Sequence, residues 1–291
     1  MGNTVRASSN TQVNRDHLDS VRGQIGFARR TSEETGPEAV TPGLDQPMLT
    51  YDVAIRNGRP IANELSLDRE GFTLIQHKIS CATGGGLEVL QNSYLKEMVP
   101  FIKNYFNASW VVPQLHGGIF IYSDEGHSVL PTQVVKDHGE VIGHPAAYAH
   151  IDYSPIAGPM IAARENQLQG VQIRPYSRLL VIQAWHVLSP IPQDSSSAFC
   201  DGASVFDTDL AAAAYGRDGV SHKTWLLHYN PFQRWYYFPK MTQGEFVLSK
   251  GYDSEDNWNP RSAHSAFVDR RAEPDVNPGE SIEARFFVYY D

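Results

Sequence analysis

The chain has 291 residues, enough for one large β-rich domain or two small ones, and it combines a high aromatic content (11%) with few charged residues (20%). Its formal net charge is −9 and its lysines and arginines are scattered, so a nucleic-acid partner is not expected. Two cysteines, Cys81 and Cys200, are too few for a disulfide framework, and neither a signal peptide nor an apolar run of membrane-spanning length is present, so a cytoplasmic protein is expected.

The first part of the chain is polar. Residues 1–46 are rich in Ser, Thr, Asn, Arg, Glu and Gly, and we expect a mobile tail with at most a short helix near Gln12–Phe27. Regular structure is expected to begin with Met48–Ile55, which alternates as a strand does, before a turn at Asn57-Gly58. Residues 47–291 are then expected to form a single jelly-roll domain.

Farther along, one helical segment precedes a long β-like region. Apolar residues of Asn92–Asn107 recur at helical spacing, which core packing explains. From Trp110 onward, short segments rich in β-branched and aromatic residues are separated by proline and glycine. The expected strands are Ser109–Leu115, Gly118–Tyr122, Ala147–Tyr153, Arg178–Leu188, Trp225–Tyr229, Arg234–Pro239, Glu245–Gly251, Ala263–Asp269 and Ser281–Tyr290.

The segments that connect these strands indicate the fold class. We expect a loop at Pro192–Ser197 and a short alanine-rich helix at Thr208–Tyr215. Strands at such spacing, without the alternation of strands and helices that builds a parallel sheet, indicate a barrel or jelly roll. The predicted fold is therefore mainly β, a double-stranded β-helix (jelly roll) with a few flanking helices.

A possible metal site lies in the segment Tyr148–Ser154. His150 and Asp152 are two positions apart, so on a strand both side chains point to the same face. An imidazole and a carboxylate on one face are two members of the 2-His-1-carboxylate triad that holds non-haem iron(II). His138-Gly-Glu140 has the same spacing, but its polar surroundings give weaker strand character, so His150 and Asp152 are preferred.

The third ligand must come from elsewhere in the chain. The candidates are His186, His222, His228 and His264. Chain order selects His264, which is flanked by small residues one strand before an arginine-bearing terminal strand. His228 as a core histidine, or His186 as a pocket residue, would need no metal.

The terminal strand contains Arg285 in an otherwise aromatic segment. A buried guanidinium needs a carboxylate partner, because an unpaired buried charge is costly. Its planar fork suits the distal carboxylate of 2-oxoglutarate, and the alternative is an internal ion pair with Glu283 or another acid. His-x-Asp, a distant His and a terminal Arg, in this order, match what a double-stranded β-helix oxygenase needs.

Seven segments together resemble one enzyme family, the CmcJ/NvfI-type iron(II)/2-oxoglutarate-dependent oxygenases. These segments are Ser66–Phe72, His150–Ser154, Phe199–Asp201, Arg234–Met241, Gly251–Ser254, Arg261–Phe267 and Glu280–Arg285. The resemblance covers residues 48–291. It implies a jelly roll with iron(II) on His150, Asp152 and His264, 2-oxoglutarate on Arg285, and O2 as the second cosubstrate. It also implies hydroxylation, desaturation or endoperoxide formation on a terpenoid-like product of fungal secondary metabolism.

One motif departs from the family pattern. Where Asn-Val-Trp-Arg is expected, this chain has Gln183-Ala-Trp-His186. The missing arginine is expected to leave the pocket less basic.

The substrate prediction depends on three long segments that we expect as loops at the barrel mouth, namely His116–Leu130, Ser154–Pro175 and Pro190–Val220. They contain several apolar residues and few cations, which favours an uncharged, apolar polycyclic small molecule. The predicted polar contacts to substrate are His116, His138 and His186, and the alternative for each is a surface or supporting position.

Two other functions stay open at this stage. A metal-dependent jelly-roll isomerase or hydrolase could use the same triad without redox chemistry. A non-catalytic partner subunit of an active paralogue could keep the fold alone, although the intact ligand set argues against it. We expect a homodimer that acts on a small molecule.

Overall fold

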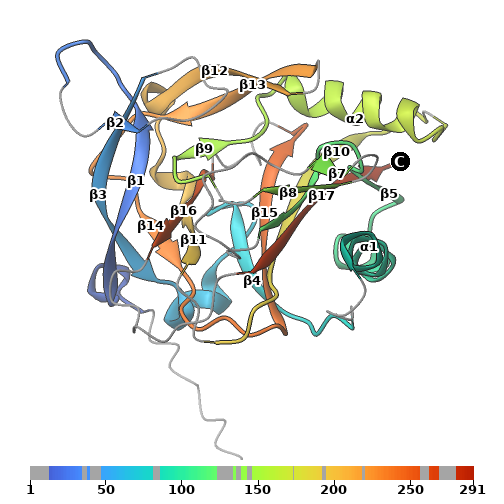
Figure 1. Ribbon diagram of the computed structural model, residues 1–291, viewed down its shortest axis with the longest axis horizontal. Helices are drawn as coiled ribbons and strands as arrows, with labels where there is room; N and C mark the ends of the chain where they lie inside the picture. The colour runs from blue at the N-terminus through green and yellow to red at the C-terminus, as the bar shows by residue number, and fades with distance from the viewer. Residues whose placement is uncertain are drawn as a thin grey trace, which may run out of the picture.

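The computed structural model describes residues 13–34, 38–39, 47–80, 86–122, 134–135, 139–142, 146–172, 174–191, 195–217, 220–255, 262–268 and 280–291. Within these residues the strands form two sheets, with the longer helices outside them (Figure 1). Sheet A has nine strands: β1 (Ser20–Ala28), β2 (Glu38–Ala39), β3 (Met48–Asn57), β9 (His150–Ile151), β11 (Ser195–Cys200), β12 (Leu210–Arg217), β13 (Val220–Leu227), β14 (Trp235–Tyr237) and β16 (His264–Val268). Sheet B has eight: β4 (Phe72–Gln76), β5 (Trp110–Pro113), β6 (Ile119–Tyr122), β7 (Val134–Val135), β8 (Gly139–Ile142), β10 (Arg178–Val187), β15 (Glu245–Asp253) and β17 (Ser281–Tyr290). The helices are α1 (Gly86–Tyr105), α2 (Ala157–Leu168) and the short 3-10 helices η1 (Arg15–His17), η2 (Arg59–Glu64), η3 (Gly202–Ser204) and η4 (Asp207–Asp209).

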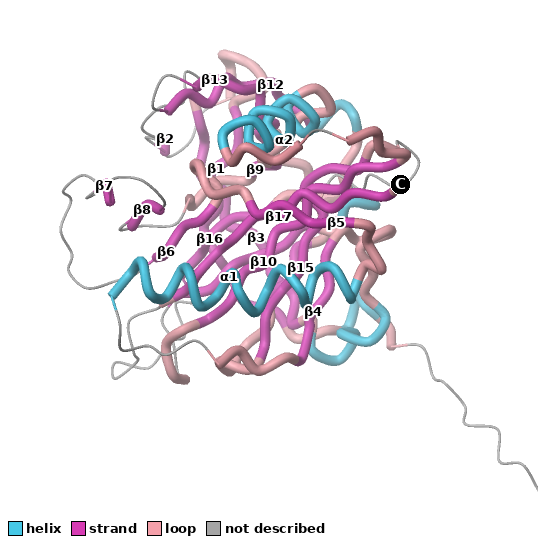
Figure 2. The backbone as a smooth tube through the Cα atoms, turned by 90° about the vertical axis from the view of Figure 1, so that its right-hand side faces the viewer, coloured by secondary structure: helices cyan, strands magenta, loops and turns pink. Residues whose placement is uncertain are grey.

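Helix α1 covers the outer face of sheet B and crosses its strands in Figure 2. Its side chains Tyr94, Met98 and Ile102 recur every four residues, are fully buried, and pack with Ile182 of β10. The helix predicted for this segment is confirmed, with its start at Gly86. Among the described residues, no helix has the length and apolar character needed to cross a membrane.

The opposite face of sheet B points toward sheet A. On β10, Leu179 and Val181 join an apolar cluster near α2, and Val187 joins a second cluster toward the other end of the strand. Between them lies Gln183, which pairs in register with Arg285 of β17. Because side chains alternate along a strand, the inward face of sheet B places these polar groups between two apolar clusters.

Sheet A curls back on itself. Strands β1 and β3 pair antiparallel from Ser20 to Ala28, and Gly26 forms a bridge with Tyr148 just before β9. The inside of the curl is an apolar core that contains Ile25 and Trp235. The prediction of a mainly β jelly roll with flanking helices is confirmed.

The predicted N-terminal tail of residues 1–46 is wrong for Ser20–Ala28. This segment is strand β1, and its side chains Val21, Ile25 and Phe27 are at most 2% exposed. The helix considered near Gln12–Phe27 reduces to the single turn η1. A polar composition concealed a period-two apolar pattern, which buries one face of the strand against the rest of sheet A.

Three other segments also differ from prediction. Most of Thr208–Tyr215 lies in β12, which forms a hairpin with β13 in a register that pairs Leu210 with Leu227. Helix propensities differ by at most about 0.7 kcal/mol per ordinary residue, so a continuous ladder overrides the alanines. The expected mouth loop at Ser154–Pro175 contains α2, and the loop predicted at Pro192–Ser197 runs into β11.

Candidate metal centre

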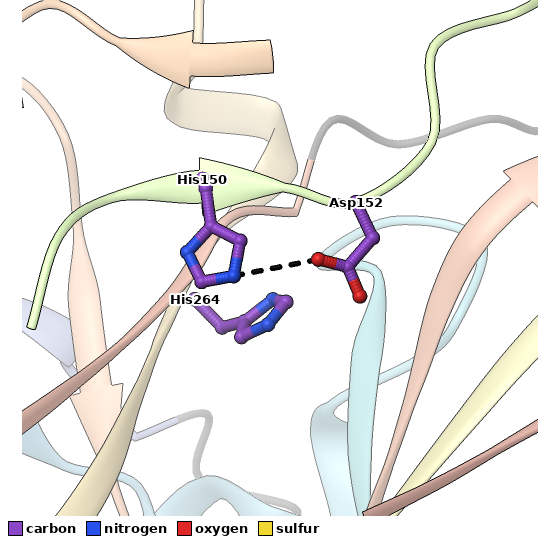
Figure 3. Close-up of side chains that lie close together, drawn as sticks. All are labelled: His150, Asp152 and His264. Carbon is purple, nitrogen blue, oxygen red and sulfur yellow. Dashed lines mark ion pairs between the residues drawn. The ribbon is translucent and has the colours of Figure 1, made fainter. Parts of the chain in front are cut away.

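His150, Asp152 and His264 converge in the interior between the two sheets (Figure 3). His150 and His264 are direct partners on the neighbouring strands β9 and β16, and their ring centroids are 4.3 Å apart. Asp152 follows His150 by two residues and turns to the same side. One ligand atom from each residue lies within 4.8 Å of the others, and no second such group of His, Cys, Asp or Glu occurs in the described part of the chain.

The tautomer of His150 is set by the backbone. Its Nδ1 lies 2.9 Å from the carbonyl oxygen of Tyr148, which can only accept, so Nδ1 carries the proton in that bond. Its Nε2 lies 3.4 Å from Oδ1 of Asp152. The lone pair of Nε2 therefore points to the place where the three side chains meet, as a metal ligand requires.

The two oxygens of Asp152 have different surroundings. Oδ2 accepts hydrogen bonds from Nε2 of Gln183 (2.6 Å) and from Nε of Arg285 (2.8 Å), and it is also paired with Nη2 of Arg285. Oδ1 faces His150 instead. One oxygen is thus fixed by sheet B, while the other is presented toward the two histidines.

The charge states follow from burial and from neighbouring charges. Burial opposes ionisation of Asp152, yet the charge of Arg285 and the hydrogen bond with His150 hold the pKa of Asp152 well below its usual range. Burial lowers the pKa of His264 to about 3, and the charge of His150 acts in the same direction. Burial also opposes protonation of His150, but the hydrogen bond and charge of Asp152 raise the pKa of His150. A metal bound at Nε2 of His150 would take the place of the proton that Nε2 carries in the charged imidazolium.

This donor set fits iron(II). Two imidazole nitrogens and one carboxylate oxygen from one side leave the remaining coordination positions facing the pocket, as in the 2-His-1-carboxylate sites of non-haem iron(II) oxygenases. A structural zinc site would instead be closed by four protein ligands.

A pocket between the sheets opens onto this cluster. It holds about 500 Å³ of space unfilled by atoms, its open mouth included. Arg285 is the only lysine or arginine among its described lining residues. The lining from sheet A and the segment before β9 is Ala146, His150, Ser197, Phe199, His264 and Ala266, and the lining from sheet B is Gln183, Trp185, Ser249, Glu283 and Arg285.

Arg285 lines the pocket, and the ion pair with Glu283, the alternative considered for this residue, is present. Its Nη2 lies 2.9 Å from Oε1 of Glu283, and its guanidinium carbon lies 4.6 Å from the ring centroid of Phe120. Together with the bonds to Asp152, these contacts place one guanidinium between two carboxylates and above an aromatic face.

Gln183 and Glu283 are pocket residues that the sequence prediction did not assign to the site. The amide nitrogen of Gln183 bonds both Asp152 and Oε1 of Glu283, the latter at 3.2 Å. Gly251 on the adjacent strand β15 leaves room for this amide, since a Cβ there would lie 3.0 Å from Oε1 of Gln183. The period-two spacing of Glu283 and Arg285 could have placed Glu283 on the same face, whereas Gln183 depends on the register of β10 against β17.

Two of the three histidines predicted as substrate contacts, His116 and His186, lie away from the pocket lining. His116 is outside the pocket lining, and its Nδ1 is 3.0 Å from Oε1 of Glu165 on α2. His186 is fully buried on the face of sheet B that packs against α1, where its Nδ1 shares a 2.8 Å hydrogen bond with the hydroxyl of Tyr94. The structure therefore corrects the expected substrate contact of His186. His138 lies outside the described residues.

The position of His186 also corrects the interpretation of the Gln183-Ala-Trp-His186 motif. Gln183 and Trp185 line the pocket, whereas His186 points to the opposite face of β10. An arginine in place of His186 would lie under α1, so its absence does not make the pocket less basic. In this motif, Gln183 is the residue that meets the candidate metal centre.

A jelly roll that carries an inward-facing His-x-Asp and a distant His has the architecture of an iron(II)-dependent oxygenase. The comparisons with known proteins agree with this class. A family model described as an oxidoreductase/YMDC permease-like domain (YDMC) matches residues 27–289. The hydroxylase/desaturase efuI of Hormonema carpetanum is 27% identical over 261 residues, which cover 84% of this chain and 84% of the relative.

Two further comparisons concern the same enzyme class. The Fe(II)/2-oxoglutarate-dependent dioxygenase nvfI of Aspergillus novofumigatus is 24% identical over 264 residues, which cover 86% of this chain and 89% of the relative. A solved structure of the iron and alpha-ketoglutarate-dependent endoperoxidase NvfI has a similar fold, with a TM-score of 0.71 at 22% identity over 93% of this chain and 98% of that one. The chain belongs to the matched oxidoreductase family and, within it, to the CmcJ/NvfI-type iron(II)/2-oxoglutarate-dependent dioxygenases. Iron(II), 2-oxoglutarate and O2 are the cofactor and cosubstrates of this class.

Proposed function

We propose that this dioxygenase binds iron(II) through Nε2 of His150, Oδ1 of Asp152 and His264. The observation that supports this assignment best is that the two carboxylate oxygens of Asp152 have different contacts. Oδ2 is hydrogen-bonded to sheet B, while Oδ1 faces the histidines. Bound iron(II) supplies the activation of O2, while conversion of 2-oxoglutarate to succinate and CO2 provides two of the four electrons that O2 takes up. In hydroxylation or desaturation the substrate provides the other two, whereas endoperoxide formation also takes up a second molecule of O2. A non-redox isomerase or hydrolase would not require 2-oxoglutarate.

Arg285 is the proposed anchor for the distal carboxylate of 2-oxoglutarate. It is the only arginine or lysine among the described lining residues, and its planar fork can form paired, charge-assisted hydrogen bonds with a carboxylate. The ring of Phe120 supports one face of the guanidinium, which limits its movement. The protein thus contributes a fixed charge at a fixed place, while the apolar clusters that flank Gln183 along the inward face of β10 limit the access of water.

The substrate we propose is an uncharged, largely apolar polycyclic molecule such as a terpenoid. Trp185 of sheet B and Phe199 of sheet A both offer aromatic surface to the pocket, and Ala146 and Ala266 leave space beside His264. Such walls favour shape and apolar contact over recognition of charge. The reaction is hydroxylation, desaturation or endoperoxide formation in fungal secondary metabolism, in keeping with the names of efuI and NvfI.

An anaerobic titration tests the metal and cosubstrate assignments together. Addition of iron(II) and 2-oxoglutarate to the wild-type protein is expected to produce a weak visible charge-transfer band. Asp152→Ala and His264→Ala are expected to lose the band and turnover while they keep the fold. His17→Ala, which removes an exposed histidine of η1, is the matched control and should retain both.

Arg285→Gln tests the anchor separately. Loss of a charge-assisted contact costs about 1.5–3 kcal/mol, so the 2-oxoglutarate requirement should rise about 10- to 150-fold, with a smaller change for the substrate.

The two experiments have different contradicting outcomes. In the anaerobic titration, an iron-loaded wild-type protein without the charge-transfer band would refute the oxygenase assignment. A change confined to substrate affinity in Arg285→Gln would refute the anchor alone.

A further inference from the structure

The pocket contains more negative charge than the proposed iron site needs. Asp152 and Glu283 both contact Arg285, with 2.8 Å between Arg285 Nε and Asp152 Oδ2 and 2.9 Å between Arg285 Nη2 and Glu283 Oε1. One guanidinium is therefore shared by two carboxylates, of which the proposed ligand set uses only Asp152.

Glu283 is a buried, hydrogen-bonded carboxylate. It is 7% exposed, and its Oε1 also accepts a hydrogen bond from the amide of Gln183 at 3.2 Å. It nevertheless lines the pocket beside Arg285, two residues earlier on the same face of β17. A buried carboxylate is tolerated only when it is paired, and here the pairing partner is the group proposed to receive the cosubstrate.

A dianionic cosubstrate that enters this pocket brings a third carboxylate to the same guanidinium. Three carboxylates around one positive charge repel one another, and Asp152 cannot leave without loss of the metal ligand set. Glu283 is the carboxylate that can yield, because it adjoins the open pocket and is not a proposed ligand.

We propose that Glu283 is a built-in competitor for the 2-oxoglutarate carboxylate on Arg285, and that it sets the affinity for the cosubstrate. This inference rests on the proposed function of Arg285. Binding of 2-oxoglutarate then exchanges one carboxylate for another at Arg285, and Glu283 turns from the guanidinium toward the pocket. The cosubstrate affinity is consequently weaker than the anchor alone would give.

The test is isothermal titration calorimetry of 2-oxoglutarate into manganese(II)-loaded protein, which measures binding without turnover. Glu283→Gln keeps the shape of the side chain and removes its charge. We expect the dissociation constant to fall about tenfold, equivalent to about 1.4 kcal/mol, as for one unit charge a few ångströms away in a partly solvated pocket. Glu255→Gln makes the same change of net charge at an exposed residue outside the pocket and should leave the affinity unchanged.

A second ligand separates competition at Arg285 from a general effect of charge. 2-Oxobutyrate has the oxo-acid group but no distal carboxylate, so Glu283→Gln should improve its binding much less than that of 2-oxoglutarate. Glu283→Asp, whose shorter side chain withdraws from Arg285, should also tighten 2-oxoglutarate binding and serves as the second variant if Glu283→Gln does not fold. Unchanged or weaker 2-oxoglutarate binding in the folded variants, or an equal gain for both ligands, would overturn the proposal. Failure of the proposed function would look different, since no metal-loaded protein, wild type included, would bind 2-oxoglutarate.

Discussion

Truncation of Ile25 in strand β1 is a direct measure of how far the N-terminal segment belongs to the core. Ile25 is fully buried inside the curl of sheet A, in one cluster with Phe27 and Trp235. Ile25→Ala removes buried apolar carbons and leaves a cavity, which costs about 2–5 kcal/mol. With a stability of about 5–15 kcal/mol typical of a native protein, this is a large share of the total.

The measurement is thermal unfolding followed by circular dichroism. Each kcal/mol lowers the melting temperature of a large domain by about 2–4 °C, so a loss of 3 kcal/mol should lower it by roughly 6–12 °C. Gln24→Ala is the matched control, because Gln24 is the adjacent, exposed residue of the same strand, and its change should stay within about 0.5 kcal/mol. Equal melting temperatures for Ile25→Ala and Gln24→Ala would refute a core role for β1 and favour the tail that composition predicted.

Three other substitutions probe the pocket and the opposite face of sheet B. Gln183→Leu removes one donor to Oδ2 of Asp152 and should weaken manganese(II) binding about tenfold, and an unchanged affinity in a metal competition assay would contradict this role. Ala266→Leu fills the space beside His264 and should suppress product formation, while calorimetry should find 2-oxoglutarate binding unchanged; normal turnover would place the substrate elsewhere. Burial lowers the pKa of His186 to about 3, against about 6.5 in the unfolded chain. Between these two pH values the unfolded state binds more protons than the folded state, so the free energy of unfolding falls as the pH drops from about 6.5 toward 3. His186→Leu should make the melting temperature less dependent on pH in that window, and an unaltered pH profile would show that His186 is not a source of the acid sensitivity.

Local pattern was sufficient for most of sheet B. The segments Arg178–Leu188 and Ser281–Tyr290 are predicted as strands and form β10 and β17, because runs of branched and aromatic residues carry their own signal. Helix α2 was not predicted from its local pattern, because Gly158 and the proline that follows it are residue types typical of loops. In the structure that proline lies in the first turn, where its missing N–H is harmless, and Gly158 allows close approach of Tyr252, whose Cγ would lie 2.6 Å from an added Cβ.

Long-range register limited the site prediction. The spacing of His150 and Asp152 is local information, and the structure brings both residues to His264. The face of β10 that meets the pocket is not local information, because a shift of one residue exchanges Trp185 for His186. For the same reason Gln183 could not be assigned before its pairing with β17 was known.

The proposed metal ligands and the residues around Arg285 lie on different sheets, which affects how substitutions can change cosubstrate binding and metal binding separately. The proposed metal ligands stand on or beside β9 and β16 of sheet A, whereas Arg285, Glu283 and Gln183 project from sheet B. In the proposed binding mode, 2-oxoglutarate would extend from the metal beside sheet A to Arg285 on sheet B, and its length is fixed. A substitution that changes the spacing of the sheets would then weaken cosubstrate binding and leave the metal ligands in place. Asp152 alone belongs to both halves, since one of its oxygens faces the histidines and the other is bonded to the opposite sheet.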